Sequence, residues 1–107
     1  MNKAILIGNL TRTPERGSTQ NGVSWCRFTV AVSRPYTDQD GQRPADFLNV
    51  VAWRGLADNC ARYLDKGRKV AVEGRIETRQ YDDQDGQRRY VTEIVADSVE
   101  FLSTPER

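Results

Sequence analysis

Two copies of one eight-residue motif carry residue types suited to hold unpaired bases and their phosphates. The motif Tyr-x-Asp-Gln-Asp-Gly-Gln-Arg occurs at Tyr36–Arg43 and again at Tyr81–Arg88. Asp-Gly favours a tight primed turn, in which both central residues have positive φ, so each copy predicts a β-hairpin finger. Each finger has a Tyr at its base and an Arg on its return; aromatic rings stack on bases and arginines contact phosphates. The alternative is that favourable turn chemistry is simply used twice.

Four aromatic side chains fall on outward strand faces or at finger bases: Tyr36, Phe47, Trp53 and Tyr81. Burying an aromatic ring stabilises a fold by about 2–3 kcal/mol, so exposed rings need another reason. Stacking on one base contributes about 1–3 kcal/mol and tolerates any base. Phe47 and Trp53 share a strand face about 20 Å apart, which suits bases several nucleotides apart. A subunit interface is the alternative for this set, and Trp25 and Tyr90 are assigned to packing.

Basic side chains near these rings are candidate phosphate ligands: Arg34, Arg54, Lys66, Arg75, Arg79 and Arg88, with Lys69 and Arg89 as further candidates. Arginine offers a planar fork for phosphate oxygens and a flat face for stacking. Arg75, Arg79 and Tyr81 alternate on one predicted strand face, which favours this trio over isolated charges. Glu73 and Glu77 share that face, and either keep the arginines extended or restrict contact to the distal strand. For each single cation the alternative is a solvated surface charge.

Two other chemistries fit the acidic finger tips less well. Asp-x-Asp-Gly occurs in calcium loops, but the first and last EF-hand ligand positions of the first copy fall on Tyr36 and Phe47. Asp82, Asp83 and Asp85 would suit a metal-dependent nuclease, but no partner His, Lys or second acidic cluster is evident. The chain has no histidine, the commonest general base and metal ligand. The sequence therefore predicts a binding protein without catalytic residues, metal or cofactor.

Composition limits the size of the core and the kind of surface. The 107 residues are 37% hydrophobic and have a mean hydropathy of −0.70, which predicts one domain with a thin core. The net charge is only +1, so nucleic-acid binding requires cations sorted onto one face. Cys26 and Cys60 lack a Cys-x-x-Cys motif and predict two buried thiols in a reducing cytosol. The apolar N-terminal run is too short for a signal peptide or a membrane span, which predicts a cytoplasmic protein.

Hydrophobic periodicity predicts five strands and one helix. The strands are expected at residues 3–10, 24–33, 46–54, 69–81 and 89–102, the helix at 56–65, and a loop at 11–22. The helix spacing predicts that Tyr63 joins the buried face, and Gly67 is expected to cap the helix C-terminus. In the fourth strand, residues from Val70 to Thr78, including Gly74 and Ile76, are expected to alternate inward.

The first strand is apolar on both faces. Ile5 and Ile7 point one way and Ala4 and Leu6 the other, so the core covers one face and another subunit is expected to cover the second. Three strands, one helix and two strands are the layout of a mainly β, five-stranded OB-fold barrel, with the helix between strands 3 and 4 and long β-hairpin extensions. A small α+β sandwich explains this order less well.

Several segments together resemble the bacterial single-stranded DNA-binding proteins. These are Met-Asn-Lys-Ala-Ile-Leu-Ile-Gly-Asn-Leu at 1–10, Asp-Phe-Leu-Asn-Val-Val-Ala-Trp-Arg at 46–54, Val-Glu-Gly-Arg-Ile-Glu-Thr-Arg-Gln-Tyr at 72–81 and Tyr-Val-Thr-Glu-Ile-Val-Ala-Asp at 90–97. The resemblance covers essentially the whole chain, in order and with the right spacing. The second segment is most similar to the form found in Gram-positive bacteria.

This resemblance implies a non-catalytic, nucleoid-associated homotetramer, a dimer of dimers, that wraps single-stranded DNA without sequence preference in replication, recombination and repair. It places the stacking aromatics at Tyr36, Phe47, Trp53 and Tyr81, and subunit pairing on the strand that contains Ala4, Ile5, Leu6 and Ile7. Of the basic candidates, Arg54, Lys66 and Arg79 match the family's contacts better than Arg75. A primosomal accessory protein, a dimeric relative, lacks most of this aromatic set.

One departure from the family concerns the C-terminus. Family members usually continue into a long Gly/Gln/Pro-rich linker and an acidic tip that recruits replication and repair proteins. Here the expected DNA-binding domain at 1–102 is followed only by a short polar tail at 103–107. A trimmed piece and a naturally short paralogue both fit, and either is expected to bind DNA but recruit such partners weakly.

Overall fold

The computed structural model describes residues 1–102, and the predicted tail at 103–107 lies outside the described residues. Within residues 1–102 the elements are, in chain order, β1 (Ala4–Leu10), β2 (Glu15–Ser18), β3 (Ser24–Ser33), β4 (Ala45–Trp53), α1 (Arg54–Tyr63), β5 (Lys69–Asp82) and β6 (Arg88–Phe101). The five predicted strands and the helix are all present. The short strand β2 is an addition inside the predicted loop.

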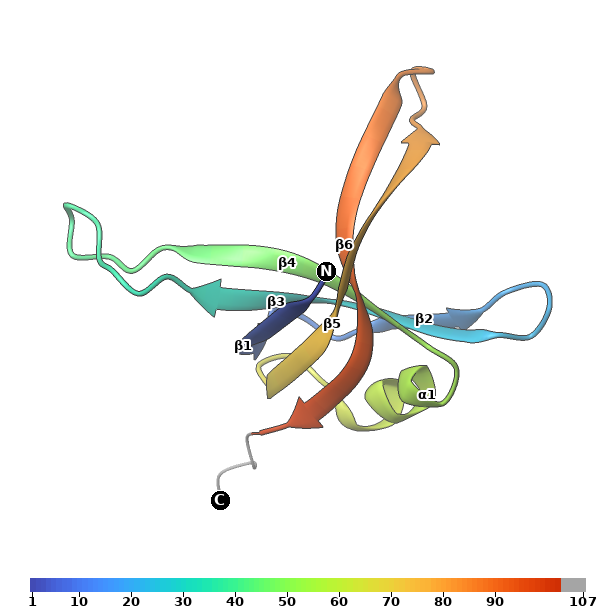
Figure 1. Ribbon diagram of the computed structural model, residues 1–107, viewed down its shortest axis with the longest axis horizontal. Helices are drawn as coiled ribbons and strands as arrows, with labels where there is room; N and C mark the ends of the chain where they lie inside the picture. The colour runs from blue at the N-terminus through green and yellow to red at the C-terminus, as the bar shows by residue number, and fades with distance from the viewer. Residues whose placement is uncertain (103–107) are drawn as a thin grey trace.

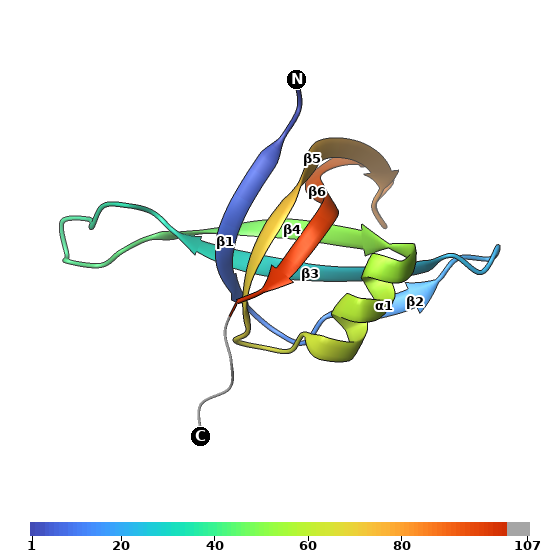
Figure 2. The same ribbon diagram turned by 60° about the horizontal axis from the view of Figure 1, so that its bottom comes forward.

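Five of these strands close into a barrel. The sheet order is β1-β5-β6-β4-β3-β2, and β1 also pairs with β3 at Asn9↔Ala31 and Leu10↔Val30, which closes the ring. The β4–β6 pairing is parallel, and the other pairings are antiparallel. Helix α1 connects the third and fourth strands of the ring and covers one end of the barrel (Figures 1 and 2). This arrangement is an OB-fold barrel, so the predicted fold class is confirmed.

The barrel core is formed by the inward residues of each strand together with one side of α1. Its buried members are Leu6, Leu10, Cys26, Phe28, Val30, Val50, Ala52, Ala57, Cys60, Leu64, Val70, Val72, Ile94 and Ala96. Both cysteines are free and buried, as predicted. Burial raises the pKa of the Cys60 thiol to about 12 and also raises that of Cys26. These thiols therefore stay protonated at neutral pH and act as small core side chains.

Strand β2 pairs with β3 along its whole length, and one close packing contact lies within this pairing. Gly17 lies opposite Trp25 in the β2–β3 register. A Cβ atom on Gly17 would lie only 2.8 Å from Cζ2 of the Trp25 ring, so only glycine lets the short strand lie flat on the indole. The assignment of Trp25 to packing therefore agrees with the structure.

The predicted helix C-terminus was wrong in two respects. Tyr63 does not enter the core. It is half exposed, and its ring lies beside that of Phe101, with ring centroids 6.0 Å apart. The helix ends at Tyr63, and Gly67 lies three residues beyond its C-cap, Leu64. Gly67 does have the expected positive φ, 87°, but it serves a turn in which the Arg68 N–H donates to the Asp65 carbonyl at 3.1 Å.

Strands β5 and β6 belong to the barrel at one end and form a free-standing hairpin at the other (Figure 1). The change occurs at Gly74, where the β5–β6 register shifts. A Cβ atom on Gly74 would lie 2.1 Å from the Val95 carbonyl oxygen, so the two backbones touch there. Beyond this point Ile76 and Thr78 are exposed, which contradicts their predicted inward position. Alternation continues along β5, but the barrel no longer covers the inward face.

The two finger tips are built alike, but not as primed turns. Gly41 and Gly86 have positive φ (78° and 79°), whereas the aspartate before each does not. The first aspartate of each tip carries the turn: the carboxylate of Asp83 accepts hydrogen bonds from the backbone N–H groups of Asp85 and Gln87, both at 2.9 Å. Asp38 does the same in the first finger. This is the longer hairpin loop with one left-handed glycine.

We expect Gly74→Ala to lower the free energy of unfolding by about 2–3 kcal/mol, because the added methyl group must push two hydrogen-bonded backbones apart. Gly55→Ala is the matched control. Gly55 lies in α1, and nothing is within 4 Å of its Cβ position. This control should leave stability unchanged or raise it by up to about 1 kcal/mol. Urea unfolding measures both; equal stabilities for the two variants would contradict the close approach.

Candidate nucleic-acid interface

The outward residues of four neighbouring strands form one continuous surface, called here the outer face. Strand registers place Trp25 beside Trp53 and Arg27 beside Val51 on β3 and β4, and Val51 beside Val95 on β6. The outer face comprises Trp25, Arg27, Thr29 and Ala31 of β3, Phe47, Asn49, Val51 and Trp53 of β4, Arg89, Val91, Glu93 and Val95 of β6, and Arg75, Glu77, Arg79 and Tyr81 of β5. Val51 and Val95 are buried outside the core cluster and form its floor.

Two predicted stacking residues mark β4 on the outer face. Phe47 is 66% exposed and Trp53 37% exposed, and both point outward, as the strand alternation predicted. Trp53 lies beside Trp25 in the register, and the Arg27 guanidinium lies 5.1 Å above the Trp25 ring. Trp25 and Arg27 therefore extend the aromatic and cationic surface. Neither was among the predicted site residues.

The first finger orients Tyr36 through an arginine. Arg34 donates from Nε and Nη2 to the Asp46 carboxylate, at 3.1 and 2.7 Å, and from Nη1 to the Tyr36 hydroxyl at 2.9 Å. Bonding to this guanidinium lowers the pKa of Asp46 below its ordinary value. The Tyr36 ring stays exposed while its hydroxyl is held. Arg34, predicted as a phosphate ligand, is thus engaged by two side chains of its own finger.

The second finger presents Tyr81 on the outer face, beside Arg89 in the register. Arg89 donates to the Asp83 carboxylate at 2.7 Å, which holds the pKa of Asp83 below its ordinary value. Arg88 lies 3.8 Å from Asp82, and these two residues line a small hollow beside Tyr81. Tyr90, assigned to packing by the sequence, is instead exposed on the opposite face of the hairpin.

The remaining predicted cations fall into two groups. Arg75 and Arg79 lie on the outer face, where Arg75 donates to Glu77 at 2.7 Å and Arg79 lies 3.5 Å from Glu93. Arg54 and Lys66 are exposed, and neither side chain has an ion pair within residues 1–102. Arg54 follows Trp53 at the corner into α1, with φ of 62°. Lys66 lies in the turn after α1, away from the four strands of the outer face.

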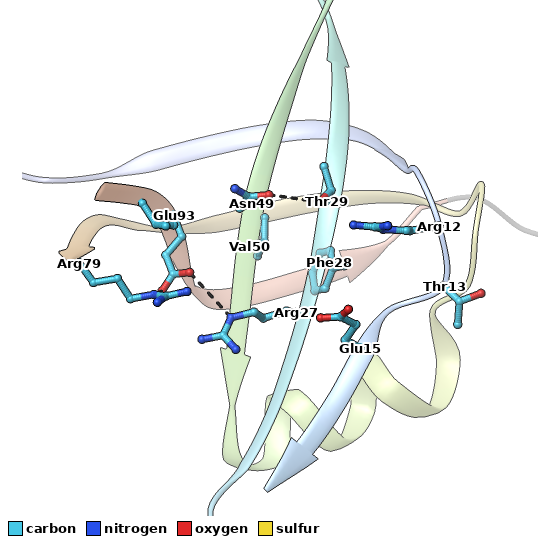
Figure 3. A pocket seen from close by; sticks show the side chains of 11 residues that line it. Arg12, Thr13, Glu15, Arg27, Phe28, Thr29, Asn49, Val50, Arg79 and Glu93 are labelled. Carbon is cyan, nitrogen blue, oxygen red and sulfur yellow. Dashed lines mark hydrogen bonds and ion pairs between the residues drawn. The ribbon is translucent and has the colours of Figure 1, made fainter. Parts of the chain in front are cut away.

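A hollow of about 260 Å³ lies on the outer face, and its β4 lining, Asn49 and Val50, falls between Phe47 and Trp53 along the strand. Figure 3 shows its polar lining: Arg12 and Thr13 from the β1–β2 loop, Glu15 from β2, Arg27 and Thr29 from β3, Asn49 from β4, Arg79 from β5 and Glu93 from β6. Sequence reasoning missed Arg12, Arg27 and Glu93. The available signal was a glutamate in the apolar stretch of β6, where a buried charge needs cationic partners.

Strand β1 carries an apolar surface of its own. Ile5 is 72% exposed and Ile7 52% exposed, whereas Leu6 belongs to the core and Ala4 packs against it. An apolar hollow of about 490 Å³ adjoins this strand, lined in part by Leu48. Of the four residues predicted to meet another subunit, only Ile5 and Ile7 thus have side chains on the open face.

Residues 1–102 contain neither a metal-binding cluster nor a membrane-spanning helix. In this part of the chain, no group of three or more His, Cys, Asp or Glu side chains converges to hold a metal ion. The same residues contain no helix that is long and apolar enough to cross a membrane.

An OB-fold barrel with exposed aromatic rings and arginines on one sheet face defines the class of a small oligonucleotide-binding-fold protein. The chain belongs to the single-strand binding protein family, whose model matches residues 1–102. The resemblance seen in the sequence is therefore confirmed.

Individual relatives support this assignment. The chain is 52% identical over 104 residues to the single-stranded DNA-binding protein of Oceanobacillus iheyensis, 52% over 102 residues to that of Bacillus cereus, and 49% over 102 residues to single-stranded DNA-binding protein 1 of Staphylococcus aureus. The matches cover 97%, 95% and 95% of this chain, but only 65%, 60% and 65% of the relatives. The similarity to the Gram-positive form is confirmed.

The lowered pKa of Asp83 predicts an acid-sensitive finger. The unfolded chain takes up this proton before the native state does, so the stabilisation is complete above about pH 4 and is lost as the pH falls through the native pKa. We expect Asp83→Asn to flatten the fall in stability between about pH 5 and pH 2. Asp85→Asn, at the same tip, removes a carboxylate that accepts no hydrogen bond within residues 1–102. Urea unfolding across this pH range measures the stability of both variants. The same dependence of stability on pH for both would contradict the assignment.

Proposed function

We propose that the chain binds single-stranded DNA without sequence preference, by stacking bases on the aromatic rings of the outer face and the first finger and pairing phosphates with arginines. The observation that carries this proposal is the pair Phe47 and Trp53, exposed on one strand face, with an arginine-lined hollow against the part of β4 between them. Both rings are held on a rigid strand, so little conformational entropy is lost when a base stacks. The names of the relatives, which are single-stranded DNA-binding proteins, support the same function.

Charge sorting supports binding of a polyanion despite the net charge of +1. Most acidic groups near the outer face are already paired with arginines, as in Arg34–Asp46 and Arg75–Glu77. Such exposed pairs contribute roughly 0–1 kcal/mol, so a phosphate can compete for the guanidinium at low cost. Arg54 and Lys66 have no ion pair to break within residues 1–102.

These contacts are the basis for the role proposed for each residue. Tyr36, Phe47, Trp53 and Tyr81 stack on bases. Arg54, Lys66, Arg75 and Arg79 contact phosphates, Arg88 contacts one only at the tip of the second finger because it lies with Asp82 on the opposite face of the hairpin, and Arg34 chiefly orients Tyr36. The carboxylates of Asp38 and Asp83 are used inside the finger turns, which leaves them poorly placed for metal-dependent cleavage.

The proposal extends to the setting of the protein. Residues 1–102 form the DNA-binding domain, which binds and protects single strands non-catalytically during replication, recombination and repair at the nucleoid. In the cell its partners are single-stranded DNA and further copies of itself.

Binding of labelled oligo-dT, followed by fluorescence anisotropy, tests the function. Wild-type protein should bind single strands in preference to duplex, with affinity that falls as salt rises, and should leave the oligonucleotide intact with magnesium. Trp53→Ala should weaken binding about tenfold, because one stacked base is lost. Tyr90→Ala, an exposed ring on the opposite face of the β5–β6 hairpin, is the control and should bind normally. Equal affinities for the two variants would exclude stacking on Trp53. Cleavage of the oligonucleotide in the presence of magnesium would contradict a binding-only function and indicate a nuclease.

We also propose that the open face of β1 pairs two copies of the chain, as the first step to a homotetramer built as a dimer of dimers. Exposed Ile5 and Ile7, next to an apolar hollow, are costly to leave in water. Ile7→Asp should lower the mass measured by light scattering, whereas Ile7→Val should not, because it keeps the face apolar. An unchanged mass for Ile7→Asp would rule out pairing through this face.

A further inference from the structure

Glu93 is the one buried charged side chain among residues 1–102, with 8% of its surface exposed. It projects from β6 into the hollow on the outer face, which Arg12, Arg27 and Arg79 also line. Burying a carboxylate is costly unless cations neutralise it. Its place on a face proposed to bind phosphates therefore requires a specific role.

Two arginines from strands on either side share this carboxylate. Nε of Arg27, on β3, lies 3.9 Å from Glu93 Oε1, and Nε of Arg79, on β5, lies 3.5 Å from Oε2. In each ion pair the nearest nitrogen is Nε, at the stem of the guanidinium. Figure 3 shows the two terminal nitrogens of Arg27 directed away from Glu93. The carboxylate thus bridges the outer face across β4 without occupying the terminal nitrogens of Arg27.

Further contacts restrict Arg27. Its guanidinium lies over the Trp25 ring at 5.1 Å, and its buried Nε makes no hydrogen bond in the described structure, so the 3.9 Å ion pair with Glu93 is what compensates it. An arginine held at its stem and over a ring keeps its terminal fork in one orientation. Such a fork suits two oxygens of a phosphate.

We propose that Glu93 is a positioning residue: it holds Arg27 and Arg79 by their stems so that their terminal nitrogens bind one phosphodiester group of the strand in the hollow. This inference rests on the proposed binding of single-stranded DNA and adds a defined phosphate subsite to it. Arg12 lines the same hollow and completes its cationic side. The hollow is lined from β4 by Asn49 and Val50, which lie between Phe47 and Trp53 along that strand.

The direction in which one substitution changes the binding affinity distinguishes positioning from simple electrostatics. Glu93→Gln removes a negative charge from a phosphate-binding face, so Coulomb repulsion alone predicts tighter binding. Positioning predicts weaker binding, because the two arginines lose their common anchor. Glu100→Gln is the matched control, because Glu100 is exposed on the same strand, β6, and forms no ion pair within residues 1–102.

Both variants are titrated with labelled oligo-dT over a salt series, beside wild-type protein. We expect Glu93→Gln to bind about three- to tenfold more weakly, with a shallower dependence of log K on log salt because fewer phosphates are contacted. Glu100→Gln should bind at least as tightly as wild type. Wild-type or tighter binding by Glu93→Gln would overturn the proposal. Absence of binding by wild-type protein would instead overturn the proposed function itself.

Lysine substitutions keep the proposal testable if Glu93→Gln does not fold. Arg79→Lys preserves the charge but has one cationic nitrogen, which cannot serve Glu93 and a phosphate together. We expect it to lose affinity with an unchanged thermal midpoint. Arg62→Lys, on α1, makes the same exchange outside the outer face and should bind like wild type. Equal affinities for the two lysine variants would overturn the proposal.

Discussion

The close approach of the β5 and β6 backbones at Gly74 is the constraint on which the rest of the structure depends. At this point the two strands are near enough that the Val95 carbonyl excludes any side chain larger than hydrogen. Strand β5 pairs with β1 up to Gly74, and β6 pairs with β4 at Ile94 and Val95, just past this point; beyond these contacts the two strands leave as a hairpin (Figure 1). One strand pair can therefore supply core residues such as Val72 and also outward residues such as Arg79 and Tyr81.

Because side chains alternate along each strand, apolar residues face the core and charged residues face outward. Inward residues fill a thin core, and outward residues of β3, β4, β5 and β6 form a face where arginines and aromatic rings gather over a valine floor. Exposed carboxylates such as Glu77 hold arginines on this face at little cost in stability, whereas the buried Glu93 needs its two arginine partners. A chain with a net charge of only +1 can thus present a cationic track.

Much of this arrangement could be predicted from the sequence, because alternation and helical spacing are local. The barrel, the helix position and the outward placement of Phe47 and Trp53 all follow from patterns within single segments. Predictions failed where tertiary geometry decides whether a side chain is buried. Ile76 continues the alternation of β5 but lies beyond the barrel. Tyr63 fits the helix spacing but stays half exposed beside Phe101. The Arg27–Glu93–Arg79 cluster joins three strands, so the apolar surroundings of Glu93 in the sequence indicate a buried charge but not which arginines pair with it.

The central claim is that single-stranded DNA lies along the outer face and stacks on its rings. The most direct test is NMR chemical-shift mapping with oligo-dT, which resolves the indole N–H signals of the two tryptophans. The account predicts large shifts for Trp53 and for the outward positions of β3 to β6, including Arg27 and Arg79, and small shifts along β1. Shifts confined to β1 or α1, with the Trp53 indole unmoved, would contradict it.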